Sequence, residues 1–237
     1  MRMLLKFAAA ILMVVPLAMA STTTCPTSGT LDLYLVPSFT CITGNLVFSN
    51  FSYSASAAPP GIKILATGIS VVPLTFTGDE GFTFTSSWSA LTQSGAVGSF
   101  LDSTIFYTVS TVNHAATIDD LFLSDNGVAT GTGLASVTEQ WCANNAIPSC
   151  PIGGLSQIFV STGSTPNNAT AIFSPISSLS VSKDISVSSG TNGTAAITTV
   201  SNNFSQTGVP EPMSCLLLGS GLLGIGLLRK RQGRLRK

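Results

Sequence analysis

The chain has 237 residues, only 8% of them charged, and its formal net charge is zero. Eight of its ten lysines and arginines lie near the two ends, so residues 21–208 keep two lysines against nine acidic residues, a net charge of −7. Because a protein that tracks phosphates needs a basic face, this composition argues against nucleic acid as a partner. The length between the ends fits one domain with a substantial core.

The N-terminus has the three parts of a secretory signal peptide in the right order. Residues 1–6 carry two basic side chains, and residues 7–17 are apolar apart from one proline. Ala18 and Ala20 then supply small residues at the −3 and −1 positions of a signal peptidase site, with Ser21 as the mature N-terminus. An uncleaved anchor is the alternative, but eleven apolar residues reach only ~16 Å of a ~30 Å hydrocarbon core. We therefore expect residues 1–20 to be removed by signal peptidase.

Four cysteines lie in the exported part: Cys25, Cys41, Cys142 and Cys150. An even number in an oxidising compartment predicts two disulfides, and four cysteines allow three connectivities. Short loops favour Cys25–Cys41 and Cys142–Cys150. A zinc site is the alternative, but the spacing lacks paired short Cys-x₂₋₄-Cys motifs. The sequence therefore predicts no metal and no cofactor.

Residues 21–204 are predicted to form one all-β domain, an antiparallel β-sandwich or jelly-roll-like fold. Its segments alternate apolar and polar residues and are rich in Val, Ile, Phe, Tyr and Thr, which is typical of strands with one buried face. The predicted strands are Leu31–Val36, Leu46–Tyr53, Ile62–Val72, Phe82–Trp88, Thr104–Ser110, Ile118–Leu123, Gly133–Trp141, Ser156–Ser161, Leu179–Val187 and Ala195–Phe204. Residues 86–92 are expected to form at most a turn or two of helix, and residues 205–209 a polar linker.

Three glycine-containing turns predict antiparallel hairpins. Residues 78–81 separate two short alternating runs, and Asn126-Gly127 and Asn192-Gly193 offer the residues that type I′ turns require. The clearest predicted hairpin joins residues 185–187 to the strand that begins at Ala195.

No catalytic residue is predicted. A triad would need His114, the only histidine, as base and Asp119 or Asp120 as its partner, but no Gly-x-Ser-x-Gly motif is present and a solvated loop histidine is the better interpretation. Asp119, Asp120 and Asp125 are the densest acidic group, yet the residues between them are apolar strand material and do not match an EF-hand loop. Asp125 is explained as part of a turn.

Five aromatic residues are candidates for stacking on sugars if they share an exposed face. They are Trp88, Trp141, Tyr34, Tyr53 and Tyr107. Strand aromatics more often fill the core, and Trp141 directly precedes Cys142, which predicts packing against a disulfide.

The C-terminal residues form three consecutive segments. Pro210-Glu211-Pro212 is followed by an apolar run, residues 213–228, which as a helix spans ~24 Å and is a short membrane anchor. The residues after it are basic: Arg229, Lys230, Arg231, Arg234, Arg236 and Lys237. By the positive-inside rule this tail stays in the cytoplasm and residues 21–208 lie on the outer side.

This order of segments, residues 210–237, resembles the PEP-CTERM sorting signal of exported bacterial proteins. The resemblance implies that an exosortase, a membrane-embedded cysteine transpeptidase, cuts near Pro210-Glu211-Pro212 and passes the protein to the cell surface. It also implies a Gram-negative host that makes exopolysaccharide. A plain C-terminal membrane anchor with a proline-rich stalk is the alternative.

Together these features predict a non-enzymatic protein of the cell surface or extracellular matrix, held transiently in the inner membrane and associated with extracellular polysaccharide. One alternative is a carbohydrate-binding module that uses Trp88 or Trp141. Another is a secreted hydrolase.

Overall fold

The computed structural model describes residues 23–76, 78–92, 98–112, 116–144, 147, 150–151, 154–162 and 167–208. The predicted signal peptide with its cleavage site at Ser21, and the sorting signal of residues 210–237, lie outside the described residues. Among the residues that are described, no helix is long and apolar enough to cross a membrane.

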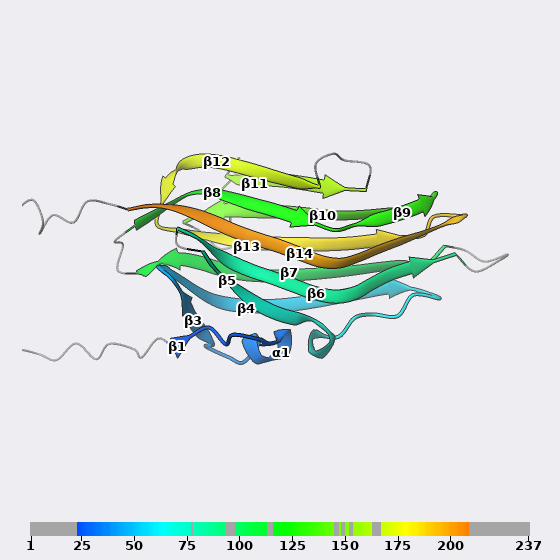
Figure 1. Ribbon diagram of the computed structural model, residues 1–237, viewed down its shortest axis with the longest axis horizontal. Helices are drawn as coiled ribbons and strands as arrows, with labels where there is room; N and C mark the ends of the chain where they lie inside the picture. Colours follow the sequence, from blue (N-terminus) through cyan, green and yellow to red (C-terminus); the bar gives the residue numbers. More distant parts are fainter. Residues whose placement is uncertain are drawn as a thin grey trace, which may run out of the picture.

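Two sheets make up the domain. Sheet A has the order β1 (Thr23–Thr24), β3 (Thr40–Thr43), β4 (Leu46–Ala58), β7 (Phe100–Thr111), β13 (Ser178–Ser188), β10 (Leu134–Ala143) and β11 (Leu155–Ser161). Sheet B has the order β12 (Asn168–Ile176), β8 (Ala116–Asp125), β14 (Gly193–Gly208), β6 (Asp79–Leu91), β5 (Ser70–Phe76) and β2 (Gly29–Thr30), and β9 (Val128–Gly131) also pairs with β14. All these pairings are antiparallel except that of β1 with β3. The long strands run side by side, with β1 and α1 (Leu31–Tyr34) at one margin (Figure 1). The predicted β-sandwich is confirmed.

Alternation along the central strands puts one face of each sheet in the core. On β7 every second residue from Leu101 to Thr111 is buried, and the residues between them are half-buried. Because strand side chains point alternately to opposite faces, this pattern gives each sheet a dry inner face and an outer face. An aromatic cluster fills the middle of the sandwich around Tyr107, whose neighbours include Phe48, Phe82 and Phe204.

The prediction of a strand over residues 31–36 was wrong, because residues 31–34 form the helix α1. Leu31 and Tyr34, which are three residues apart, are buried, whereas Leu33 is 47% exposed and Val36 57% exposed. The apolar run therefore follows the spacing of a helical turn and not the period of two.

The prediction of a strand over residues 62–72 was correct only at its end, where β5 begins at Ser70. Before it lie an irregular segment and η1, a 3₁₀ turn over Ala66–Gly68. Ile62 and Leu65 are 81% and 62% exposed, so these two apolar residues do not face the core.

Of the three glycine-containing turns predicted to form hairpins, only the first does so. The β5–β6 hairpin is confirmed, since Phe76 pairs with Asp79 and Gly78 has a φ of 83° between them. The predicted hairpin at Asn192-Gly193 was wrong, because β13 belongs to sheet A and β14 to sheet B, so the connection crosses from one sheet to the other. Asn126-Gly127 likewise joins β8 to β9, which both pair with β14 and not with each other.

Eight of the predicted strands lie in β4, β6, β7, β8, β10, β11, β13 and β14. Residues 86–91, predicted as part of a helical turn, instead continue β6. The sequence missed β12, whose residues include Pro175; β12 is an edge strand of sheet B, where a missing N–H is tolerated.

Candidate functional site

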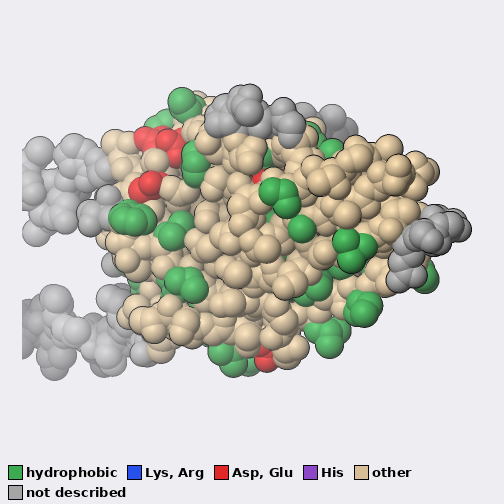
Figure 2. Space-filling view, turned by 45° about the vertical axis from the view of Figure 1, so that its right-hand side comes forward, with side chains coloured by type: hydrophobic (Ala, Val, Ile, Leu, Met, Phe, Trp, Pro, Cys, Tyr) green, Lys and Arg blue, Asp and Glu red, His purple; other side chains and the backbone are tan. Residues whose placement is uncertain are grey.

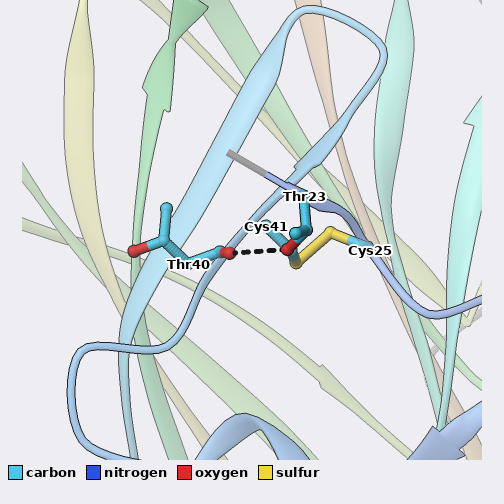
Figure 3. The surroundings of a disulfide bond; sticks show 4 residues. All are labelled: Thr23, Cys25, Thr40 and Cys41. Carbon is cyan, nitrogen blue, oxygen red and sulfur yellow. Dashed lines mark hydrogen bonds between the residues drawn. A yellow bond between two sulfur atoms is a disulfide. The ribbon is translucent and has the colours of Figure 1, made fainter. Parts of the chain in front are cut away.

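The four cysteines form the two disulfides that loop length favoured, Cys25–Cys41 and Cys142–Cys150. In Figure 3 the first of them joins the segment after β1 to β3, beside a hydrogen bond from the Thr23 hydroxyl to the Thr40 carbonyl at 3.5 Å. The Cys25 amide also donates to the Ile42 carbonyl at 2.9 Å. Two disulfides in one domain indicate an oxidising compartment, outside the cytoplasm.

The candidate sugar-stacking aromatics lie in the core. Trp88, Tyr34 and Tyr107 are at most 1% exposed, and Trp141 is 8% exposed with its ring centroid 6.1 Å from that of Phe173. Tyr53 is half-buried, and its hydroxyl lies 2.9 Å from the Ile64 carbonyl and 3.1 Å from the Ser103 hydroxyl. These residues therefore do not form an exposed aromatic platform, and the interpretation of strand aromatics as core residues was correct.

The acidic residues of β8 are engaged with their neighbours. Asp119 accepts a hydrogen bond from the Thr207 hydroxyl, and Asp120 accepts one from the Ser205 amide at 3.2 Å. Asp125 accepts from the Gly127 amide at 2.7 Å, as expected of a turn, and burial raises its pKa. The described residues contain no group of three or more histidine, cysteine or acidic side chains that could hold a metal ion. His114 lies outside them.

The structure reveals a group of polar residues that the sequence analysis missed. Tyr107, Glu139, Lys183 and Asn202, here called the buried polar centre, are each 0% exposed between the two sheets. Tyr107 on β7, Glu139 on β10 and Lys183 on β13 come from sheet A, and Asn202 on β14 comes from sheet B. The sequence did contain an indication of this group, because Lys183 lies at an inward position of β13, between the buried residues Val181 and Ile185.

Contacts link the members of the buried polar centre. Glu139 and Lys183 are directly paired across β10 and β13, and the Lys183 ammonium forms an ion pair with Glu139 Oε2. The Tyr107 hydroxyl donates to Asn202 Oδ1, and Asn202 Nδ2 donates to the Phe122 carbonyl at 2.9 Å. The Asn202 side chain also lies beside the Glu139 carboxyl and favours its charged form, which partly offsets the rise of the Glu139 pKa.

The apolar surroundings disfavour charge throughout this centre. Burial raises the pKa of Glu139 and lowers that of Lys183, and in each case the attraction of the partner opposes the effect of burial only in part. Burial, reinforced by the neighbouring Glu139, also holds the pKa of Tyr107 well above its ordinary value. Burial therefore opposes the charged forms of both side chains, and their mutual attraction supports them.

Hydroxyl-bearing side chains cover the outer face of sheet A, here called the hydroxyl face. One cross-strand row runs Ser54, Thr104, Asp184, Thr138, Phe159. The next row runs Ser56, Asp102, Ser186, Ser136, Ser161. The face is therefore broad and carries few charges.

Two carboxyls meet on the hydroxyl face. Asp184 and Asp102 lie diagonally on neighbouring strands and are hydrogen-bonded through their side chains. Partial burial, followed by the repulsion of Asp102, raises the pKa of Asp184 to about 6. Because the two carboxyls are hydrogen-bonded to each other, they lie closer than the pair that flanks a glycosidic bond, whose members are about 5 Å or more apart.

The surface of the domain is largely uncharged. The face drawn in Figure 2 is mostly backbone and side chains that are neither charged nor hydrophobic, with scattered hydrophobic side chains, a few acidic groups and no lysine or arginine in view. A shallow pocket beside residues 60–64 is lined by aliphatic and serine side chains such as Ile64, Ser89 and Leu101, and carries no titratable group.

No family model matches the chain, and no curated protein matches it. One solved structure that resembles it is that of TmCBM61 in complex with beta-1,4-galactotriose, at 9% sequence identity over 66% of this chain and 88% of that chain. The TM-score is 0.29, which is too low for the likeness to support an argument about function.

Proposed function

We propose that the chain is an exported, non-enzymatic protein of the cell surface or extracellular matrix. The observation that carries the proposal is where the side chains lie: the large aromatic residues Trp88 and Tyr107 and the Lys183–Glu139 ion pair are buried. Two disulfides brace the fold, and the hydroxyl face is on the outside of sheet A. A domain of this kind suits a role as a durable surface element.

Delivery is proposed to depend on both ends of the chain. Signal peptidase releases the N-terminus at Ser21, residues 213–228 hold the protein in the inner membrane, and an exosortase cuts near Pro210-Glu211-Pro212. The support is the order of these segments in the sequence together with an ectodomain whose disulfides require an oxidising compartment.

The test is the mass of the surface-released protein in a host with and without its exosortase. Termini at Ser21 and near Pro210 are expected in the first host, with membrane retention in the second. A variant with Pro210→Ala and Pro212→Ala should be retained in both hosts, and a Pro175→Ala control should be released normally. A C-terminus that stays embedded and uncut while the exosortase is present would refute this route.

The hydroxyl face is proposed to contact extracellular polysaccharide. Rows of Ser and Thr side chains on the outer face of sheet A offer donors and acceptors to sugar hydroxyls, with few charges to desolvate. Co-sedimentation with the host's polysaccharide should weaken roughly fivefold for Ser54→Glu, about the value of one polar contact. Thr85→Glu, on the outer face of sheet B, is the matched control. Equal binding by both variants would exclude the hydroxyl face as the contact surface.

A further inference from the structure

The buried polar centre brings an amine, a carboxyl and a carboxamide together in the core of the sandwich. Lys183 contacts Glu139 Oε2, and Asn202 reaches the same carboxyl from the opposite sheet. All three side chains are 0% exposed. The amine of Lys183 and the amide of Asn202 therefore flank a single carboxyl in a site closed to solvent.

A simple buried ion pair leaves this arrangement poorly satisfied. An ammonium has three donors, yet among the contacts of the described residues Lys183 donates only to Glu139. Glu139 Oε1 is buried without a hydrogen-bond partner in the same part of the chain. Removing two charges from water costs several kcal/mol per ion unless the remaining donors and acceptors are satisfied. The centre therefore gains little as a static ion pair.

We propose that Lys183 and Asn202 react to form an intramolecular amide bond between Lys183 Nζ and Asn202 Cγ, which joins β13 of sheet A to β14 of sheet B. The bond between Asn202 Cγ and Nδ2 breaks, and the nitrogen leaves as ammonia. The reaction needs no oxidant, cofactor or external nucleophile.

Protons balance within the centre. The Lys183 ammonium first gives one proton to Glu139 Oε2, which leaves a neutral amine and a carboxylic acid. The amine attacks Asn202 Cγ, and the addition product passes a second proton from Nζ to Nδ2, with Glu139 as the relay. Ammonia then departs, the carbonyl reforms, and Glu139 remains protonated. Burial favours these uncharged forms, since the pKa of Glu139 is raised and that of Lys183 lowered.

Two further groups support the reaction. The Tyr107 hydroxyl donates to Asn202 Oδ1, the oxygen on which negative charge develops during attack. The Phe122 carbonyl accepts from Asn202 Nδ2 at 2.9 Å and fixes the orientation of the amide. Because both sheets hold the reactants in place, the attack is an intramolecular step with a high effective concentration.

The test uses the full chain, purified from an exporting host and then reduced and denatured. A protease that cuts before aspartate separates Lys183 from Asp184, so the fragment that ends at Lys183 and the fragment that begins at Asp184 stay joined only if a bond links their side chains. We expect one branched peptide, lighter than the sum of the two fragments by one ammonia, with fragmentation that places the branch at Lys183 and Asn202.

Variants assign the roles. Lys183→Met, Asn202→Ala and Glu139→Gln should each give two separate fragments, and Tyr107→Phe should slow the joining. Lys63→Met changes the other lysine of the domain, which is exposed, and should leave the branched peptide unchanged.

Separate fragments from the unaltered chain would overturn the proposal, whether or not the variants fold. A branched peptide that persists in Lys183→Met would assign the bond elsewhere and overturn it too. A branched peptide that persists in Glu139→Gln at an unchanged rate would remove Glu139 from the reaction.

Discussion

At the scale of single residues, the carboxyls of Asp102 and Asp184 make the free energy of unfolding depend on pH. The pKa of Asp184 rises from 3.8 to about 6 in the folded protein, so folding favours its protonated form. This contribution to stability is complete below about pH 4 and is lost as the pH rises toward 6. Asp184→Asn should therefore raise stability at pH 7 by about 1 kcal/mol after allowance for solvent screening.

Thermal unfolding between pH 3.5 and 7.5 checks this prediction. The gain from Asp184→Asn should vanish at the acid end of the series. Asp102→Asn removes only the repulsion and not the cost of burying Asp184, so its gain should be smaller and the double variant should gain little over Asp184→Asn alone. A gain that is equal at every pH would rule out the carboxyl pair as its cause.

Trp88 offers a second prediction at this scale. Its side chain is fully buried, and its indole N–H donates to the Ser103 hydroxyl at 3.1 Å. Trp88→Ala should lower the free energy of unfolding by about 3–5 kcal/mol, the usual cost of such a cavity. Urea denaturation measures this loss of stability, and Leu91→Ala, at an exposed position, is the control. Full stability together with lost sugar binding would instead place Trp88 at a surface site.

At the scale of elements, the Cys25–Cys41 disulfide anchors a segment that has little else to hold it. β1 is two residues long, and it lies at the edge of sheet A, where it pairs in parallel with β3. Replacing both cysteines by serine should cost about 3 kcal/mol, since the closed loop constrains the unfolded chain. The Cys142–Cys150 loop is half as long, 8 against 16 residues, and its removal should cost slightly less. Denaturant unfolding of the two double variants compares them.

The strands predicted correctly are those in which alternation and β-branched residues coincide. The failures arose where the buried residues did not follow that alternation. Leu31 and Tyr34 are buried from a single helical turn, and Ile62 is exposed although it is apolar. The connection after β13 contains residues typical of turns, but it leads to the opposite sheet. Turn residues indicate that the chain reverses there, and they do not determine which strand the next segment pairs with.

At the scale of the whole molecule, the sequence predicted the sandwich and its disulfides but not the buried polar centre. From the sequence alone, Glu139 and Lys183 are expected at the surface, because lysine and glutamate are rarely buried unless they are paired. Their place in the inward phase of β10 and β13 could be read from the sequence, but their approach to Asn202 depends on how the two sheets stack. The alternation of residues within one strand does not show which residues of the opposite sheet lie against it.

The position of β14 has a mechanical consequence. It is the strand that leads directly into the tail, and it lies inside sheet B, hydrogen-bonded to β8 and β9 on one side and to β6 on the other (Figure 1). A pull applied at residue 208 along the strand would shear these ladders together instead of peeling them one bond at a time. A cell that tethers this domain by its tail would thus apply drag from flowing water to a strand that is hydrogen-bonded on both sides.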